Sequence, residues 1–496
     1  MAQLDYILRN ATIVDGTGAM PYQGSIGIAG GRVEQLGDVQ GSAKEDMDLS
    51  GLTISPGFID VHTHDDFAAV LYPDMAFKLR GGVTSCVVGN CGMGAAPFPQ
   101  AATLAKSFHP NHQLPGWDGY KGYLELLDNH PTSVNIAALV GHGTVRMAVL
   151  GRQQREPDNR EMDKMKQLVL EGLDAGAVGF STGLVYEPGC YARTEEVIEL
   201  ASLMKSTGGL YATHMRDEGN YLLESIDEAI EIGVKAGVPV QISHHKASGP
   251  ENWGKVRESI RKIETAQAKG MNIHADQYPY TAGSTILSAV LHQGAFDNKG
   301  GGKENISPEN VVIASTKNRP EWEGKSIASL MVDFNLPARE TALKVLESES
   351  GATVVMHTIS EDDVREVMKH SSTMIGSDGI PTLEGKPHPR LYNTFARVIG
   401  HYARDIQLMS LADAIYKMTG FSARKFGLID RGEIQIGAFA DLVVFDAEKI
   451  IDKGTFADPN QYPAGIYHVF VNGILSVKDG LCLNERSGRV LRRKKL

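Results

Sequence analysis

The chain has 496 residues, and its 49 basic and 60 acidic side chains give a formal net charge of −11. Its length exceeds the ~250–300 residues at which a single core stops growing, so at least two structural units are expected. The negative charge argues against a nucleic-acid-binding surface, because phosphate contacts need clustered Lys and Arg. The sequence contains no apolar run of the ~18 residues that a membrane-spanning helix requires, and its first residues do not resemble a secretory signal.

Two further features of composition bear on where and how the protein works. The one basic run, Arg492–Lys495, is typical of a solvated tail. Four cysteines are too few and too scattered for a disulfide framework in a chain of this length, so a reducing, cytoplasmic compartment is expected. A cysteine with a special role must then be explained by its chemistry.

Both ends of the chain have a strand-like texture. The first residues contain short apolar runs separated by turns such as Gly30-Gly31, which indicates a hairpin. The same texture returns in Ala440–Asp446 and Tyr467–Gly473. Because each end is too short to fold alone, we expect residues 1–55 and 425–496 to form one composite β-sandwich domain.

The middle of the chain repeats another pattern, in which short apolar runs lead to a polar residue and many are followed by helical stretches. Continuous apolar runs are typical of buried parallel strands. Eight such units predict an α/β fold, a (β/α)8 barrel over residues 56–424, with its chemistry at the carboxyl ends of the strands. An open doubly wound sheet is the alternative, but it predicts a Gly-rich phosphate turn after its first strand, where this chain has His62-Thr63-His64. The eight runs are Gly57–Asp60, Thr84–Val88, Val134–Val140, Ala177–Phe180, Leu210–Ala212, Val238–Ile242, Met271–Ala275 and Thr373–Ile375.

The interval between the seventh and eighth runs is much longer than an ordinary loop. It extends from Thr281 to Ser372, beyond the length at which a connection stays unstructured. We expect residues 285–350, which include the glycine-rich stretch Asn298–Gly302, to form an insertion that acts as a lid over the catalytic end. The alternative is a surface excursion without a function.

Four histidines follow the barrel runs in positions that favour a metal site. His62 and His64 are two residues apart, so in an extended segment their side chains point the same way. His214 and His244 end two later runs. Each one alone is as readily a structural histidine, but four that converge on one barrel face indicate a metal, since imidazole, thiolate and carboxylate are the usual zinc ligands.

Two other residues at run ends complete this set. Cys91 follows the second run, where a thiolate ligand is favoured over a small buried hydrophobe. Asp378 ends the eighth run, and its carboxylate could bind the metal or move a proton from water to a leaving amine. The local alternative for Asp378 is an aspartate that opens a turn.

Sequence blocks throughout the chain resemble the amidohydrolase superfamily, and more closely its D-aminoacylase (N-acyl-D-amino-acid deacylase) family. They occur in order over essentially the whole chain. The metal-bridging lysine of many superfamily members is absent from the fourth run, and Cys91 is present instead, as in the D-aminoacylase branch. The blocks are Gly57–Asp66, Gly89–Gly92, Tyr211–Gly219, Ile242–Lys246, Asp276–Tyr280, Gly376–Gly379, Lys386–Arg390 and Ala440–Asp446.

The resemblance implies a zinc-dependent enzyme that hydrolyses the amide bond of N-acyl-D-amino acids, giving a carboxylate and a free D-amino acid. It assigns one tightly held zinc and a second, weaker position, with Asp378 as general base and then general acid. The tight position matches Cys91, His214 and His244, and the weaker one matches His62, His64 and Asp378, with Cys91 able to bridge.

The resemblance also implies how the substrate is held. Lys246, Tyr278 and Arg390 match positions that bind it, with a cation or phenol directed at the α-carboxylate or the scissile carbonyl. Such cations are needed because the expected partner is a small anionic molecule and the protein carries a charge of −11; Arg pairs with carboxylate through two hydrogen bonds. The segment after Tyr280 matches the family's insertion over the active site.

Two other functions are compatible with parts of the pattern. A cyclic-amide hydrolase of the hydantoinase or dihydroorotase kind would use the same barrel, but that branch relies on the carbamylated lysine that is missing here. A non-catalytic scaffold with an amidohydrolase barrel would be expected to lose metal ligands, whereas this chain keeps all six. We therefore expect an enzyme without nucleic-acid or membrane partners.

Overall fold

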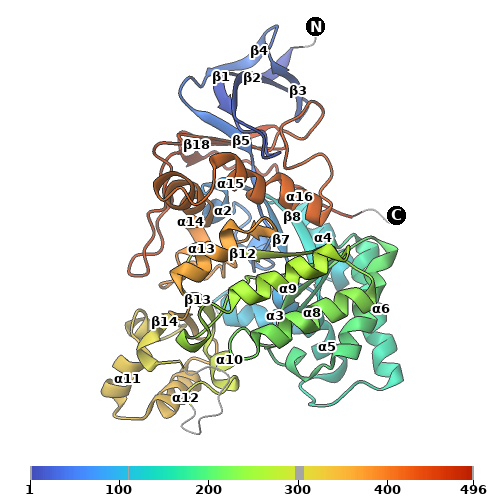
Figure 1. The fold of residues 1–496 in the computed structure, drawn as a ribbon, viewed down its shortest axis with the longest axis vertical. Coiled ribbons are helices and arrows are strands. Elements are labelled where there is room, and N and C mark those ends of the chain that lie inside the picture. The colour runs from blue at the N-terminus through green and yellow to red at the C-terminus, as the bar shows by residue number, and fades with distance from the viewer. Residues whose placement is uncertain (1–2, 110, 297–305, 494–496) are drawn as a thin grey trace.

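A computed structural model describes residues 3–109, 111–296 and 306–493 (Figure 1). It places a barrel between a β-rich unit and a small insertion (Figure 1). The glycine-rich stretch Asn298–Gly302 lies outside the described residues. None of the helices in the described part of the chain is long and apolar enough to cross a membrane.

Eight parallel strands form the barrel, and each coincides with one of the eight apolar runs, so the predicted (β/α)8 architecture is confirmed. Strands that follow one another in the chain pair side by side, from β6 round to β16. Their side chains are almost all buried, because helices cover the outside of the barrel and side chains fill its inside. The strands are β6 (Phe58–Asp60), β7 (Val83–Val88), β8 (Asn135–Gly141), β9 (Gly179–Gly183), β10 (Leu210–His214), β11 (Val240–Ile242), β12 (Ile273–Gln277) and β16 (Thr373–Ile375).

The barrel closes at a seam between its first and last strands, β6 and β16. These two strands are the ends of the sheet order, and the link between them lies just beyond their carboxyl ends. There the amide of Asp378 donates to the carbonyl of His62 at 2.7 Å, and the amide of His64 donates to the carbonyl of Gly379 at 3.1 Å. The seam therefore places His62, His64 and Asp378 side by side.

Amphipathic helices surround the barrel. The helix α6 (Asn159–Ala175) begins at a capping box of Asp158 and Glu161 and ends at Gly176, whose left-handed conformation favours glycine. It buries one apolar face, including Val169 and Leu173, against the strands. The other helices of the barrel region are α1 (Ala68–Leu71), α2 (Ala76–Leu79), α3 (Phe98–Phe108), α4 (Gly119–Asn129), α5 (His142–Leu150), α7 (Thr194–Ala201), α8 (Leu222–Ala236), α9 (Val256–Ala268), α13 (Glu361–Lys369), α14 (Arg390–Arg397), α15 (Leu411–Met418) and α16 (Gly420–Phe426).

Strands from both ends of the chain join in one mixed sheet, as expected for a composite β unit. The sheet order is β20-β19-β18-β17-β5-β1-β2-β3, with β4 paired to β1. The two ends meet where β5 pairs antiparallel with β17, and the limits 1–55 and 425–496 stay a prediction. The strands are β1 (Leu4–Ile13), β2 (Tyr22–Ala29), β3 (Arg32–Gly37), β4 (Ala43–Asp48), β5 (Thr53–Pro56), β17 (Leu442–Phe445), β18 (Ile466–Val471), β19 (Ile474–Lys478) and β20 (Leu481–Cys482).

The basic run at the end of the chain contacts other parts of the protein through its described residues. Arg492 forms an ion pair with Asp128, and Arg493 donates from Nε to the carbonyl of Thr207 at 2.9 Å. Arg492 is exposed, as expected for a solvated run, and Arg493 is half-buried. Charge patterning alone cannot show which carboxylates and carbonyls lie nearby. The last residues, 494–496, lie outside the described part of the chain.

The insertion between β12 and β16 is a small unit with its own core. A three-stranded antiparallel sheet of β13 (Gly283–Ile286), β15 (Thr353–Met356) and β14 (Val311–Ser315) packs with three helices. Apolar side chains such as Leu287 and Trp322 fill the space between sheet and helices. The predicted insertion is thus present (Figure 1). Its helices are α10 (Leu287–His292), α11 (Ile327–Phe334) and α12 (Ala338–Ser348).

Candidate metal centre

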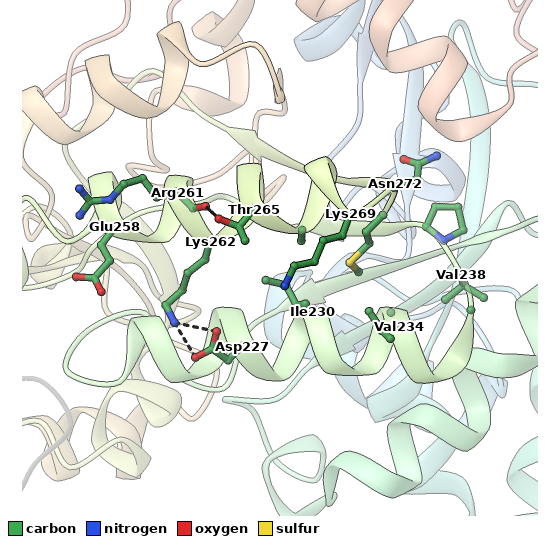
Figure 2. A pocket seen from close by; sticks show the side chains of 16 residues that line it. Asp227, Ile230, Val234, Val238, Glu258, Arg261, Lys262, Thr265, Lys269 and Asn272 are labelled. Atoms are coloured by element: carbon green, nitrogen blue, oxygen red, sulfur yellow. Dashed lines mark hydrogen bonds and ion pairs between the residues drawn. The ribbon is translucent and has the colours of Figure 1, made fainter.

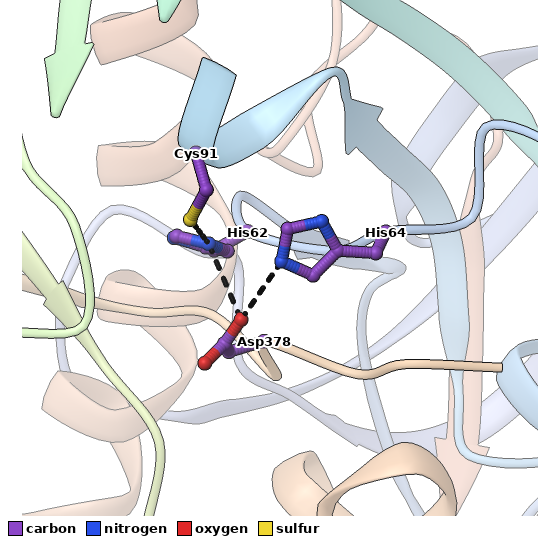
Figure 3. Close-up of side chains that lie close together, drawn as sticks. All are labelled: His62, His64, Cys91 and Asp378. Carbon is purple, nitrogen blue, oxygen red and sulfur yellow. Dashed lines mark hydrogen bonds and ion pairs between the residues drawn. The ribbon is translucent and has the colours of Figure 1, made fainter. Parts of the chain in front are cut away.

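The six residues expected as metal ligands come together at the carboxyl ends of the barrel strands, and all six are buried. Among the described residues, two groups bring their ligand atoms within 4.8 Å of one another, and both groups contain Cys91. Figure 3 shows the first group around the carboxylate of Asp378. The first group is His62, His64, Cys91 and Asp378, and the second is Cys91, His214 and His244.

Three of these residues have backbones in the left-handed region, which residues other than glycine rarely adopt. The φ angles are 53° at Cys91, 36° at His244 and 49° at Asp378. Such conformations cost about 1–3 kcal/mol each and persist where surrounding contacts hold them. One such contact is the 2.8 Å hydrogen bond from the His244 amide to Asp276. The strain indicates that the side-chain directions at this site matter more than local stability.

The donor atoms at this site suit zinc. The Sγ of Cys91 lies 3.3 Å from Nε2 of His62 and 3.5 Å from Nε2 of His244. Nε2 of His64 lies 3.1 Å from Oδ1 of Asp378. Nδ1 of His214 is buried and lacks a hydrogen-bond partner among the described residues. Imidazole nitrogen, thiolate sulfur and carboxylate oxygen are the donors that zinc takes in proteins, so the residues present fit this ion.

The electrostatics of the cluster also favour a cation. Burial alone would raise the pKa of the Cys91 thiol, but the imidazoles of His62, His214 and His244 hold it well below its ordinary value. Burial opposes ionisation of Asp378 too, yet the neighbouring cationic groups, led by Arg390, hold the pKa of this carboxyl well below its usual range. The cluster therefore offers an ionised thiolate and an ionised carboxylate, which a divalent ion would neutralise.

Two buried carboxylates that the residue-by-residue prediction missed lie beside the outer nitrogens of two histidines. Oδ1 of Asp276 lies 3.2 Å from Nδ1 of His62, and Oε1 of Glu218 lies 2.9 Å from Nδ1 of His244. A carboxylate on the outer nitrogen fixes the tautomer of a metal-binding histidine and raises its basicity. Both lie within sequence blocks that carry the family resemblance, which was the available signal, but their partners are on other strands.

The expected substrate-binding residues lie beside the cluster. Lys246 forms a 2.6 Å ion pair with Glu218. Arg390 is fully buried and holds Oδ2 of Asp378 from Nη2 at 2.9 Å, while its Nε and Nη1 have no partner among the described residues. Its guanidinium lies over the ring of Tyr278, 4.4 Å from the centroid, and the Tyr278 hydroxyl is likewise buried and unpaired in the described part of the chain.

Two hollows meet at the cluster. A narrow cavity of about 50 Å³ is lined by Lys246, Tyr278 and Asp378 together with residues of the insertion. A larger chamber of about 570 Å³ is lined by Cys91. Tyr186 lines both hollows and hydrogen-bonds at 3.2 Å to Thr285 of the insertion. Sequence reasoning missed Tyr186, which no motif marks.

A hollow larger than either of these lies elsewhere, between α8 and α9 on the outside of the barrel (Figure 2). Its volume is about 1130 Å³. An ion pair of Lys262 with Asp227 at 2.8 Å crosses it (Figure 2), and none of the predicted site residues lines it. Size alone therefore does not identify the functional site of this protein.

Comparisons with known proteins agree with this geometry. The model of the amidohydrolase family matches residues 45–299 and 261–477. The chain is 39% identical to the D-aminoacylase of Alcaligenes xylosoxydans xylosoxydans, covering 99% of this chain and 98% of that protein. A solved D-aminoacylase with a binuclear metal centre has a TM-score of 0.89 and 38% identity, with 99% and 100% of the two chains covered. An N-acyl-D-glutamate deacylase from Bordetella bronchiseptica, in complex with zinc and a phosphonate mimic of the tetrahedral intermediate, has a TM-score of 0.89, 34% identity and the same coverage.

The hydantoinase alternative receives much weaker support. A solved D-hydantoinase covers 99% of this chain, but its TM-score is 0.58 and its identity is 15%, so the likeness shows the fold alone. The fourth barrel strand, β9, reads Gly-Phe-Ser-Thr-Gly and provides no lysine. The comparisons therefore separate this chain from the cyclic-amide hydrolases.

Proposed function

The chain belongs to the D-aminoacylase (N-acyl-D-amino-acid deacylase) family of amidohydrolases, and from this premise we propose that it hydrolyses the amide bond of N-acyl-D-amino acids with zinc as its cofactor. The enzyme is a hydrolase of linear amides. The observation that carries the proposal is the buried cluster of histidines, Cys91 and Asp378 at the carboxyl ends of the barrel strands, where this fold performs its chemistry.

We assign two metal positions to the cluster. Cys91, His214 and His244 hold the tight zinc, and His62, His64 and Asp378 form a weaker second position that Cys91 can bridge. The membership of Cys91 in both groups supports this assignment. When bound, zinc supplies Lewis acidity, which polarises the scissile carbonyl and lowers the pKa of water from 15.7 to about 7.

Asp378 moves the proton in this proposal. Its carboxylate takes a proton from the attacking water and returns it to the nitrogen of the departing D-amino acid. The position of Asp378 supports the role, because it lines the narrow cavity while its Oδ2 is held by Arg390 at 2.9 Å. Because this contact fixes the orientation of the Asp378 carboxylate, little conformational entropy is lost when it contacts the attacking water.

Tyr278 and the two cations position the substrate. The unpaired Tyr278 hydroxyl is suited to donate to the carbonyl oxygen as negative charge develops on it. Lys246 lines the same cavity. Arg390 pairs with Asp378, which also lines it, and has two donors without a partner among the described residues. We assign these cations to the α-carboxylate, which a protein of charge −11 must attract locally.

The larger chamber supports a substrate with a neutral side chain. Its lining combines apolar with uncharged polar side chains, and the ionisable ones among the described residues, other than Cys91 and Tyr186, are Arg152, Glu187 and His292. Glu187 lies 4.0 Å from Arg152 and 3.6 Å from His292, so both basic side chains already have a carboxylate partner. An acidic side chain would need a second free cation besides those on the α-carboxylate, since a buried carboxylate without a partner is costly. Apolar lining residues include Met93, Leu104, Met147, Val185, Ile286 and Ala289.

The test is a substrate screen on zinc-loaded protein. We expect turnover of N-acetyl-D-methionine, D-leucine and D-phenylalanine, slower turnover of the D-glutamate and D-aspartate derivatives, and none of the L-isomers. Equal rates for D- and L-isomers, or no turnover of any, would refute the function. The Asp378→Ala variant is expected to lose activity while it retains the tight zinc at the other three ligands, which separates catalysis from metal binding.

We further propose that the enzyme acts in the cytoplasm on small anionic molecules and has no nucleic-acid or membrane partner. Cys86, Cys91 and Cys482 are not joined by disulfides in the described part of the chain, as a reducing compartment would keep them. The family relatives named above support the small-molecule partner.

A further inference from the structure

A buried lysine crosses the seam of the barrel beneath the metal centre. Lys78, on α2, is 1% exposed. Its Nζ donates to Oδ2 of Asp60 at 2.7 Å and to Oγ of Ser377 at 2.8 Å, and it lies 3.4 Å from Oδ2 of Asp65. Asp60 belongs to the first strand of the barrel and Ser377 follows the last one, so this single side chain links both sides of the seam.

Asp60 and Ser377 extend the link to the metal-ligand candidates. The Asp60 carboxylate accepts from the Ser377 amide at 2.8 Å and from the Ser377 hydroxyl at 2.6 Å. It also lies 3.3 Å from the amide of His62. Asp60 precedes His62 by two residues and Ser377 directly precedes Asp378, so the cluster connects the two backbones that carry these side chains.

The seam needs such a link because its strands do not form a ladder. Apart from the two backbone bonds beyond the strand ends, β6 and β16 are not paired. Asp378 adopts a φ of 49°, which the chain does not favour by itself. A Cβ on Gly379 would lie 3.0 Å from the Ser377 hydroxyl and 3.1 Å from Nζ of Lys78, so the turn is packed tightly around the lysine.

Lys78 stays charged in this position. Burial opposes its charge, but the carboxylates of Asp60 and Asp65 outweigh burial and hold its pKa above the ordinary value. An uncharged side chain of the same length would leave both carboxylates without their cation, and the Ser377 hydroxyl without its donor. The contacts of the lysine with Asp60, Asp65 and Ser377 would then be lost while the bulk of its side chain is kept, and the two hydrogen bonds from Ser377 to Asp60 would remain without the cation that holds them.

We propose that Lys78 is a positioning residue of the active site, which acts through Asp60 and Ser377 to fix Asp378 relative to His62 and His64. It touches neither substrate nor metal. The consequence is twofold: the alignment of Asp378 with the attacking water, and the affinity of the weaker metal position, depend on Lys78. The proposal rests on the function proposed above, but its metal-binding part can be measured without any substrate.

The test compares Lys78→Met with Lys417→Met. Lys78 contacts Ser377, just beyond the carboxyl end of β16, and Lys417 is a buried lysine at the other end of that strand. Lys417 is 4% exposed and donates from Nζ to the carbonyl of Thr373, the first residue of β16, at 3.0 Å. Three quantities are measured for each variant: kcat and KM at one zinc per chain, the dissociation constants of both zinc positions by chelator competition, and the unfolding temperature of the zinc-free protein.

For Lys78→Met we expect a fall in kcat and in the affinity of the weaker zinc position, each of about 10–100-fold, with KM and the tight zinc unchanged. Lys417→Met is expected to lower the unfolding temperature and leave kcat and both zinc affinities unchanged. A Lys78→Met protein that keeps wild-type kcat and zinc affinities overturns the proposal. The same losses in Lys417→Met would also overturn it, since any buried lysine would then suffice.

Ser377→Ala provides a second test should Lys78→Met not fold. It keeps the ion pair of Lys78 with Asp60 and removes the hydroxyl that joins this pair to the turn of Asp378. We expect the same split, with a lower kcat, an unchanged KM and a weaker second zinc. Unchanged values would refute the role of the cluster. If the wild type lacks deacylase activity altogether, the proposed function fails, and the zinc affinities still decide whether Lys78 positions the site.

Discussion

The carboxylate of Glu218 is expected to tune the tight zinc without binding it. Its two oxygens are shared among Lys246 at 2.6 Å, His244 at 2.9 Å and His214 at 3.4 Å. Burial alone would raise its pKa, but Lys246 and the two histidines hold it below the ordinary value. Glu218 is therefore ionised over the whole working range of pH, and replacing it by Gln removes a charge while keeping the shape of the side chain.

The size of the effect follows from what Glu218 leaves behind. Loss of an outer carboxylate on a metal-binding histidine costs about 10–100-fold in metal affinity, or roughly 1.4–2.7 kcal/mol. In the zinc-free protein, Lys246 would keep a buried charge with no carboxylate beside it, which costs roughly 3–5 kcal/mol of folding free energy. We expect Glu218→Gln to show both losses.

Chelator competition measures the zinc affinity, and urea unfolding of the zinc-free protein measures the stability. Glu228→Gln is the matched control, because Glu228 also pairs with a cation, Arg216, at 2.8 Å, but it is not in contact with the metal-ligand candidates in the described structure. The control should lose stability alone. A Glu218→Gln variant with wild-type zinc affinity would show that this carboxylate does not orient His244.

Three further predictions concern the metal, the carbonyl and pH. Cys91→Ala should abolish binding at both metal positions, whereas His64→Asn should retain one zinc per chain; elemental analysis distinguishes them, and equal zinc contents would contradict the bridging role. Tyr278→Phe should lower kcat by about 10²–10³-fold at unchanged zinc content, and a kcat near that of the wild type would exclude the hydroxyl as a donor to the carbonyl. Burial, with a smaller contribution from His112, lowers the pKa of His109 to about 4. The unfolded chain binds a proton at this position below about pH 6.5, and the folded protein binds it only below about pH 4. The free energy of unfolding should therefore fall by roughly 3 kcal/mol as the pH drops from about 6.5 to about 4. His109→Phe should lack this part of the loss in urea unfolding, and parallel pH profiles would contradict it.

The barrel could be predicted from the sequence because buried parallel strands have a simple signature. Leu210–Ala212 is apolar throughout and ends near a histidine, and the strand β10 (Leu210–His214) lies there. Strand ends share one face of a barrel, so residues that are distant in the chain could be brought together by the fold alone. The same logic placed His62, His64 and Asp378 side by side.

The remaining features depend on contacts between strands, which no linear pattern records. Asp276 holds His62 across the barrel, and Lys78 holds Ser377 across the seam, although neither pair is close in sequence. Tyr186 becomes part of the site because the insertion folds back on it. Such partners are fixed by the register of the strands and the path of the insertion, and these are set only when the whole chain has folded.

The pairing of β5 with β17 has a consequence for how the protein folds while it is being synthesised. Thr53 pairs with Phe445, so β5 must wait for a strand that is synthesised only after the whole barrel region. Until then β5 has only β1 beside it, and its other edge is an open template for pairing with another chain. Since Gly57 leads directly from β5 into the first barrel strand, we expect the nascent chain to need protection from aggregation until β17 emerges.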